Sequence, residues 1–140
     1  MDFNCTNCTN CTNYFRSPEA PGQPQSLTID DVSPDHVTLS WHAPASDGGT
    51  PVRAYVVKQR KADDKRGDYS TVCEINATEN CLSHTARELA PDSGYEFMVV
   101  ARNDVGDGQA LMTQKAVVTK PRVSKYCGTY SCWYKLCYYF

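Results

Sequence analysis

The sequence has no long hydrophobic run, no excess of charge of either sign and no signal-like start. It carries 14 Lys and Arg against 16 Asp and Glu, a formal net charge of −2. This balance gives no electrostatic reason to expect nucleic acid or an anionic membrane as a partner. No apolar stretch approaches the roughly 20 residues of a membrane-spanning helix. The start, MDFNCTNC, lacks the basic and apolar regions of a secretory signal peptide.

Motifs for catalysis or for holding a cofactor are also missing. We find neither a strained nucleophile turn nor a glycine loop that would cradle phosphate. His36, His42 and His84 are scattered over expected strands and lack the spacing of metal ligands. The acidic pairs lie in expected turns, where solvated charge is the usual explanation. We therefore expect neither an enzyme nor a bound cofactor.

The middle of the chain predicts short β-strands separated by turn residues. Val37, Leu39 and Trp41 alternate with polar residues, which is typical of a strand with one buried face. Tyr55 and Val57 are expected to face inward from a second strand in the same way. Seven such strands with these spacings predict an all-β, two-sheet Greek-key sandwich. The expected strands lie near residues 27–30, 37–42, 52–61, 69–75, 82–89, 95–103 and, last, in a segment that ends near 119.

Several short motifs occur in order along this block. They are Leu39-Ser40-Trp41 before Pro44, Asp47-Gly48-Gly49 before Tyr55, Leu89-Ala90-Pro91, Tyr95, and the run 99–103 before Gly106 and Gly108. Together they resemble a fibronectin type III domain that extends over about residues 22–121. The resemblance implies a core that contains Trp41, Tyr55, Leu89 and Tyr95. It also implies a tyrosine corner, in which the Tyr95 hydroxyl bonds to the backbone near Leu89. Residues 31–60 are especially similar to such domains of giant muscle proteins, which favours the cytoplasm.

The eight cysteines divide the chain into three parts. Residues 1–21 form a Cys/Asn/Thr-rich tail with a proline linker, and residues 122–140 form a Cys- and aromatic-rich tail. The domain at 22–121 contains Cys73 and Cys81, which flank a short loop. We favour a disulfide between these two, which would stabilise the domain by roughly 2–3 kcal/mol. Two reduced thiols are the alternative. The other cysteines are Cys5, Cys8, Cys11, Cys127, Cys132 and Cys137.

The terminal cysteines favour links between copies of the chain. Three lie near each end, and the prolines at 18–24 predict an extended polyproline II linker that holds the first tail away from the body. Pairing the first tail of one copy with the last tail of the next gives a head-to-tail contact that propagates into a filament. Local pairing within each tail, reduced tails and a zinc site are the alternatives. A zinc site is disfavoured because Cys5, Cys8 and Cys11 lack a second separated pair of ligands.

Four Asn-X-Thr sequons favour an oxidising, extracellular compartment. They begin at Asn4, Asn7, Asn10 and Asn76, and a sequon is used only when the chain enters the secretory pathway. Asn76 is the best expected glycan site because we place it on a loop. The other three each precede a cysteine, so we expect at most partial occupancy there.

Arg66-Gly67-Asp68 lies in an expected charged loop. The triplet resembles the integrin-binding motif that certain fibronectin-type modules display on a later loop. The alternative, which we favour, is a charged turn with Gly67 at a positive φ.

From these observations we expect an extracellular structural or adhesive protein that assembles with itself through its tails. The aromatic tail at 126–140 is expected to pack on its own sandwich, on a neighbouring copy or along an edge strand. A cytoplasmic protein-binding module of a scaffold or muscle-type protein is the first alternative. A fragment of a cell-surface receptor or integrin ligand is the second.

Overall fold

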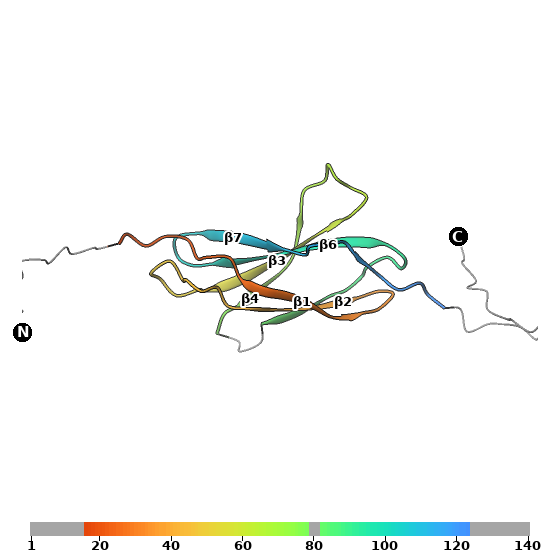
Figure 1. Cartoon of the computed structure of the whole chain (residues 1–140), viewed down its shortest axis with the longest axis horizontal. Coiled ribbons are helices and arrows are strands. Elements are labelled where there is room, and N and C mark those ends of the chain that lie inside the picture. Colours follow the sequence, from red (N-terminus) through yellow and green to blue (C-terminus); the bar gives the residue numbers. More distant parts are fainter. Residues whose placement is uncertain (1–15, 79–81, 124–140) are drawn as a thin grey trace, which may run out of the picture.

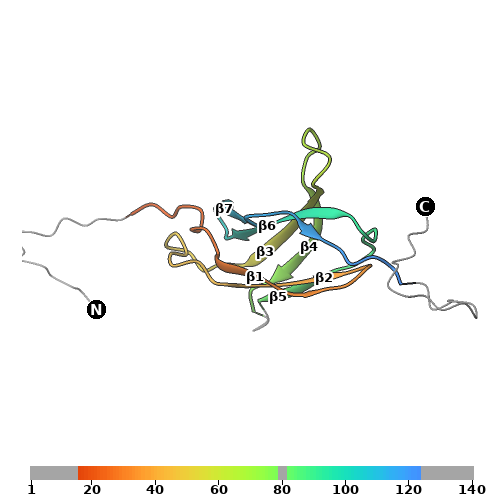
Figure 2. The same cartoon turned by 45° about the vertical axis from the view of Figure 1, so that its right-hand side comes forward.

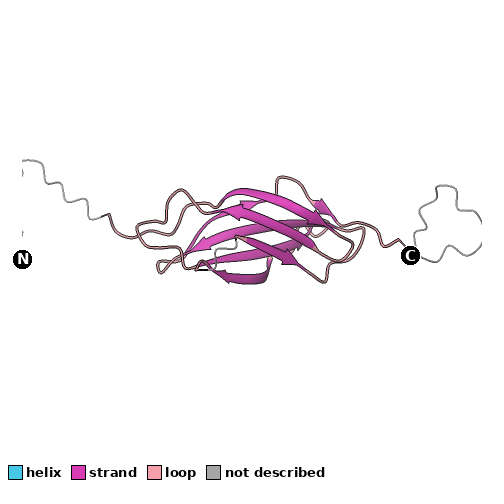
Figure 3. Cartoon of the chain, turned by 90° about the horizontal axis from the view of Figure 1, so that it is seen from below, coloured by secondary structure: helices cyan, strands magenta, loops and turns pink. Residues whose placement is uncertain are grey.

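The computed structural model describes residues 16–78 and 82–123, which form a sandwich of two antiparallel β-sheets (Figure 1). One sheet has the strand order β1-β2-β5, and the other has the order β4-β3-β6-β7 with β8 also paired to β6. Figure 3 shows the strands running roughly along the long axis of the molecule. The predicted all-β sandwich is confirmed. The strands are β1 (Gln25–Val32), β2 (Val37–His42), β3 (Ala54–Lys61), β4 (Ser70–Asn76), β5 (Ser83–Ala86), β6 (Gly94–Arg102), β7 (Asp107–Met112) and β8 (Val117–Val118).

The last predicted strand is interrupted, so the described residues contain eight strands instead of seven. Both β7 and β8 pair with β6, but the register shifts between Met98↔Met112 and Tyr95↔Val117. In this interval the backbone N–H of Thr113 donates to the carbonyl of Phe97 at 3.0 Å. The Thr113 hydroxyl accepts from the N–H of Phe97 at 3.2 Å, where a ladder carbonyl would otherwise accept. At the break between β7 and β8, the Thr113 hydroxyl thus takes the place of a backbone carbonyl as the acceptor.

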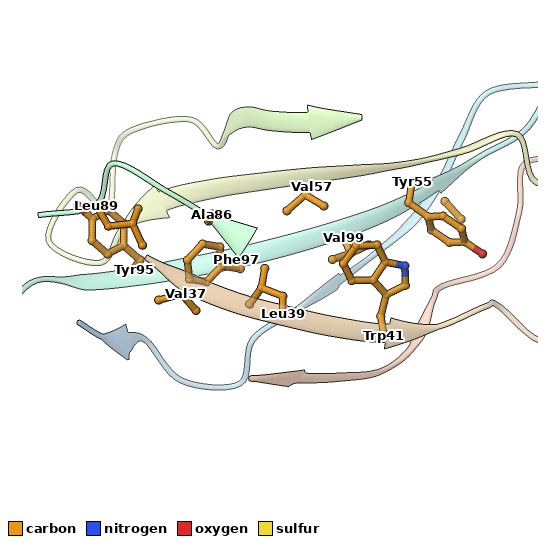
Figure 4. Close-up of a cluster of buried hydrophobic side chains, with 11 residues drawn as sticks. Val37, Leu39, Trp41, Tyr55, Val57, Ala86, Leu89, Tyr95, Phe97 and Val99 are labelled. Carbon is orange, nitrogen blue, oxygen red and sulfur yellow. The ribbon is translucent and has the colours of Figure 1, made fainter. Parts of the chain in front are cut away.

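The core lies between the two sheets, and its inward-facing side chains follow the alternation of β2. Val37, Leu39 and Trp41 are at most 2% exposed. Trp41 meets Tyr55 from the opposite sheet, with ring centroids 5.8 Å apart (Figure 4). Burial of such large apolar side chains supplies most of the favourable free energy of folding. The core comprises Val37, Leu39, Trp41, Tyr55, Val57, Ala86, Leu89, Tyr95, Phe97, Val99 and Ala101.

Burial on β3 extends beyond the two predicted positions. Tyr55 and Val57 belong to the core cluster, but Ala54 and Val56 are also at most 4% exposed. Because successive side chains of a strand point to opposite faces, Ala54 and Val56 lie on the outer face of their sheet. There β4 and β6 flank β3 on both sides. Neighbouring side chains of the outer face therefore cover the middle of β3.

The corner between β5 and β6 is fixed by two polar side chains. The Tyr95 hydroxyl accepts a hydrogen bond from the backbone N–H of Ala90 at 2.9 Å. Thr119, which is 1% exposed, donates from its hydroxyl to the Ala90 carbonyl at 2.6 Å and accepts from the N–H of Ser93 at 3.0 Å. These hydrogen bonds fix the chain just after Glu88, whose φ of 60° lies in the left-handed region.

The sequence predicts an extended linker at 18–24 that holds the first tail away from the body, but this segment is docked on the sandwich. Its backbone binds the body: the N–H of Glu19 donates to the Gly48 carbonyl at 2.8 Å, and the N–H of Gly22 to the Ser46 carbonyl at 2.9 Å. Two of its three prolines are buried. A Cβ at Gly48 would lie 2.1 Å from the Glu19 carbonyl oxygen, so the close contact requires glycine there. The segment is therefore docked on the sandwich.

Asn103, only 5% exposed, holds this segment to two loops. Its amide nitrogen donates to the carbonyls of Glu19 at 2.7 Å and Asp47 at 2.9 Å. Its amide oxygen accepts from the backbone N–H groups of Val105 at 2.9 Å and Gly106 at 3.1 Å.

The two ends of the described chain leave the sandwich at opposite ends of its long axis (Figures 1 and 2).

Replacing Tyr95→Phe should lower the free energy of unfolding by about 1–3 kcal/mol, because the part-buried N–H of Ala90 loses its acceptor. Tyr55→Phe is the matched control, since the Tyr55 hydroxyl forms no hydrogen bond with another described residue. Chemical denaturation of the two variants measures the difference. Equal losses in both would contradict a specific role of the Tyr95 hydrogen bond.

Candidate functional site

The loop between β3 and β4 projects from the body of the sandwich. It spans residues 62–69 and stands out above the β4-β3-β6-β7 sheet in Figures 1 and 2. The loop begins where β3 ends against β6, with the N–H of Ala62 donating to the Gly94 carbonyl at 2.9 Å. Loops that a rigid sheet holds in place are the usual site of recognition in such folds. We therefore take this loop as the candidate site.

A compact turn holds the middle of the loop. The N–H of Asp64 donates to the Lys61 carbonyl at 3.1 Å. The N–H of Gly67 donates to the Asp64 carboxylate at 2.8 Å. A Cβ at Gly67 would lie 2.2 Å from this carboxylate, so a side chain there would displace it. The expectation of a positive φ at Gly67 is wrong, because the described residues with positive φ do not include it. Glycine is favoured there by the close approach of Asp64.

Arg66 and Asp68 present opposite charges on either side of this turn. Both side chains are exposed. Neither forms a hydrogen bond or an ion pair with another residue of the described chain. A guanidinium offers several donors in a planar fork, and a carboxylate offers acceptors or a metal ligand. The turn thus presents both charges to solvent, where a partner can reach them.

The base of the loop rests on a cluster of Tyr69, Arg60 and Glu96. Arg60 donates to the Glu96 carboxylate at 2.6 Å, and the Tyr69 hydroxyl donates to the same carboxylate at 3.0 Å. The Arg60 guanidinium carbon lies 4.5 Å from the centroid of the Tyr69 ring. This contact has the geometry of a cation–π interaction. The cluster ties the end of the loop to β3 and β6.

The charges of this cluster shift one another's titration. The hydrogen bond from Arg60, followed by that from Tyr69, holds the pKa of Glu96 below its usual value of 4.5. Burial raises the pKa of Tyr69, and its hydrogen bond to Glu96 adds to the increase. The hydrogen bond to Glu96 raises the pKa of Arg60. All three groups therefore keep the hydrogen-bonding forms seen here at neutral pH.

The outer face of the same sheet carries an apolar strip bordered by ion pairs. The strip runs across Val56, Val100 and Met98 to Met112, which is 50% exposed. The Tyr69 hydroxyl lies 3.8 Å from the sulfur of Met112 and so connects the strip to the loop. This strip is not predictable from the sequence alone, because its members become neighbours only when the strands pair.

Two charged clusters lie toward the other end of the sheet. Arg102 binds Asp107 and also donates to Glu74 at 3.0 Å. The hydrogen bond to Asp107 raises the pKa of Arg102 and lowers that of Asp107. Arg53 donates to both carboxylate oxygens of Asp104, at 3.0 and 2.9 Å. The guanidinium groups of this region are thus already paired.

The structure does not bring the other predicted site residues together with the loop. Cys73 is half-buried on β4, forms no disulfide with another described residue and is paired in register with Val57. Its predicted partner Cys81 lies outside the described residues, so the disulfide stays a prediction. Asn76 is exposed, but it is the last residue of β4 and not a loop residue as expected. Also outside the described residues are Asn4, Asn7, Asn10, Cys5, Cys8, Cys11, Cys127, Cys132 and Cys137.

Within residues 16–78 and 82–123, no three His, Cys, Asp or Glu side chains gather closely enough to hold a metal ion. The same part of the chain contains no helix that is long and apolar enough to cross a membrane.

Comparison with known families agrees with the all-β sandwich described above. The family model described as Fibronectin type III domain matches residues 22–115. The chain belongs to this family. Among curated fibronectin type III relatives, the mouse protein "Cell adhesion molecule-related/down-regulated by oncogenes" is 40% identical over 115 residues, which are 79% of this chain and 9% of that protein. Drosophila melanogaster titin is 31% identical over 117 residues, which are 79% of this chain and 1% of titin.

Solved structures also show the likeness in fold. The twitchin kinase region of C. elegans superposes with a TM-score of 0.66 at 26% identity, over 81% of this chain and 19% of that one. The present chain spans less than a tenth of the length of the curated relatives described above. Fibronectin type III domains similar to this one therefore occur in cell adhesion molecules and in muscle proteins.

Replacing Arg60→Gln should raise the pKa of Glu96 toward its usual value of 4.5, because the largest cause of its depression is removed. A depressed carboxyl pKa stabilises the fold above the unfolded-state pKa, and this contribution is lost as pH falls through the folded-state pKa. The variant should therefore be less stable than the wild type at neutral pH, and the difference should shrink in acid. NMR titration measures the pKa of Glu96. Chemical unfolding at neutral and at acidic pH measures the difference in stability. Lys58→Gln is the control, and an unchanged Glu96 pKa in Arg60→Gln would refute the assignment.

Proposed function

We propose that this chain is a non-catalytic, protein-binding module of a larger adhesion or scaffold protein, and that its β3–β4 loop makes the contact. The observation that carries the proposal is the exposure of Arg66 and Asp68 on an ordered, projecting turn. The occurrence of similar domains in a cell adhesion molecule and in titin supports a binding role. Both relatives are much longer than this chain, so their whole activities are not transferred to it.

The hydrogen bonds within and beneath the loop favour binding. A loop that is already ordered loses less conformational entropy when it meets a partner. Asp64 orders the turn, and Glu96 with Arg60 orders its base. The exposed charges project beyond these supports, so binding need not disturb the sheet. The partner that fits this site has an acceptor for a guanidinium and a donor or metal ion for a carboxylate.

The partner differs between the two compartments. In the extracellular alternative it is an integrin-like receptor, because the triplet Arg66-Gly67-Asp68 resembles that motif. In the cytoplasmic alternative it is another component of a scaffold or filament. The same loop serves both, and the adhesion and muscle relatives support one alternative each.

The test compares single substitutions in the loop. Asp68→Ala and Arg66→Ala should each weaken binding to an integrin ectodomain that recognises the Arg-Gly-Asp triplet by about tenfold or more, as expected for the loss of a central charged contact. Asp68→Glu should also weaken binding, because the carboxylate moves. Asp63→Ala changes a nearby exposed charge outside the triplet and should not. Equal binding by all four variants, measured by surface plasmon resonance, would exclude the triplet as the contact.

A second candidate function is head-to-tail self-assembly of a domain at 22–121 through its two tails. It is favoured by one observation: the described chain leaves the sandwich at opposite ends (Figure 1). The cysteines that would form the links lie outside the described residues. The relatives in adhesion and muscle proteins support the binding module better than this assembly.

Self-assembly predicts a ladder of covalent oligomers when the oxidised chain is separated by electrophoresis without reductant. Reduction should collapse the ladder to the monomer, because the links are disulfides. Replacing Cys127, Cys132 and Cys137 by Ser should also abolish it and leave the fold intact by circular dichroism. A single monomer band before reduction would exclude the assembly.

A further inference from the structure

Asn76 occupies a position on the sandwich where a sugar chain can be attached without disturbing the core. It is the last residue of β4, which pairs with β3 on one side and forms the edge of the sheet on the other. Asn76 and Thr78, the two residues that define the sequon, are both exposed. The Asn76 amide forms no hydrogen bond with another described residue, so its nitrogen is not engaged elsewhere.

The register places Asn76 on the outer face of the sheet. It pairs with Ala54, and directly opposed residues of an antiparallel pair share a face. The neighbouring pair, Tyr55↔Ile75, contributes to the core side. A substituent on Asn76 therefore points away from the core. Arg102 pairs with Ala54 and so lies on the same face with its ion pairs to Glu74 and Asp107, whose polar groups suit a hydrated saccharide.

We propose that Asn76 carries an N-linked glycan when this chain is made in the secretory pathway. In the transfer, the amide nitrogen of Asn76 forms a bond to the anomeric carbon of the donor sugar. The donor is an oligosaccharide on a lipid diphosphate, and its bond from the anomeric carbon to the diphosphate oxygen breaks. The amide proton passes to the departing diphosphate, so that no oxidant or reductant is needed. The sequon Thr78 supplies the hydroxyl that such transfer requires.

The glycan would protect one edge of the sandwich and leave the candidate binding loop free. An exposed edge strand is prone to pair with other chains, and bulky polar groups block this. The loop lies at the opposite end of β4, beyond Ser70. Six residue steps along a strand separate Ser70 from Asn76 by about 20 Å. Glycosylation at Asn76 is thus compatible with the proposed contact through Arg66 and Asp68, but does not depend on it.

The experiment uses the whole chain directed into the secretory pathway of cultured mammalian cells, with Asn4, Asn7 and Asn10 replaced by Gln so that one sequon remains. Peptide N-glycosidase should shift the secreted chain to lower mass and convert Asn76 to aspartate, as read by peptide mass spectrometry. Thr78→Ala should abolish the shift, and Thr78→Ser should retain it. A secreted, folded chain with Asn76 unmodified would overturn the proposal.

A second measurement tests the placement of the glycan. Amide NMR spectra of the glycosylated chain and of the same chain made in bacteria, in which Asn76 is unmodified, should differ near Asn76, Arg53 and Arg102, and agree across residues 62–69. Changes centred on the loop would overturn the placement on the outer face. Binding of the integrin ectodomain should be equal for these two forms of the chain. If loop binding is absent altogether, the mass shift still decides the glycan proposal by itself.

Discussion

The antiparallel pairing of β3 with β6 is the constraint on which the other features of this domain depend. The two strands pair without a register shift from Ala54↔Arg102 to Lys61↔Tyr95. On one face this ladder brings Tyr55 and Val57 into the core with Val99 and Ala101. On the other face it sets Arg60 opposite Glu96 and so builds the base of the projecting loop. A slip of one residue would exchange the two faces and destroy both.

Much of this fold is predictable from the sequence, because the signals are local. The alternation of Val37, Leu39 and Trp41 and the turn residues between the strands suffice for an all-β sandwich. The corner tyrosine was expected to bond near Leu89, and its hydroxyl binds the N–H of Ala90. What was missed depends on contacts between distant segments. The docking of residues 19–22, the break at Thr113 and the burial of Val56 on the outer face each require a partner strand or loop whose register the sequence does not reveal.

In the candidate site, too, the local features were predictable and the contacts between distant segments were not. The loop and its exposed triplet follow from the sequence, since charged residues between two strand patterns predict a surface turn. The role of Gly67 does not, because the conflict with a side chain arises from where the Asp64 carboxylate lies. The cluster of Arg60, Tyr69 and Glu96 joins two strands and a loop and was invisible before they were paired. One sandwich serves both adhesion and muscle proteins, so its function depends on such local groups and not on the fold.

Each end of the sandwich has a buried polar residue that anchors the chain there. Asn103 binds the segment that precedes β1, and Thr119 binds the corner beneath the end of β8. Both anchors lie between the outgoing chain and the sheets. The two ends of the described chain are thus fastened to the sandwich by side-chain hydrogen bonds as well as by strand pairing.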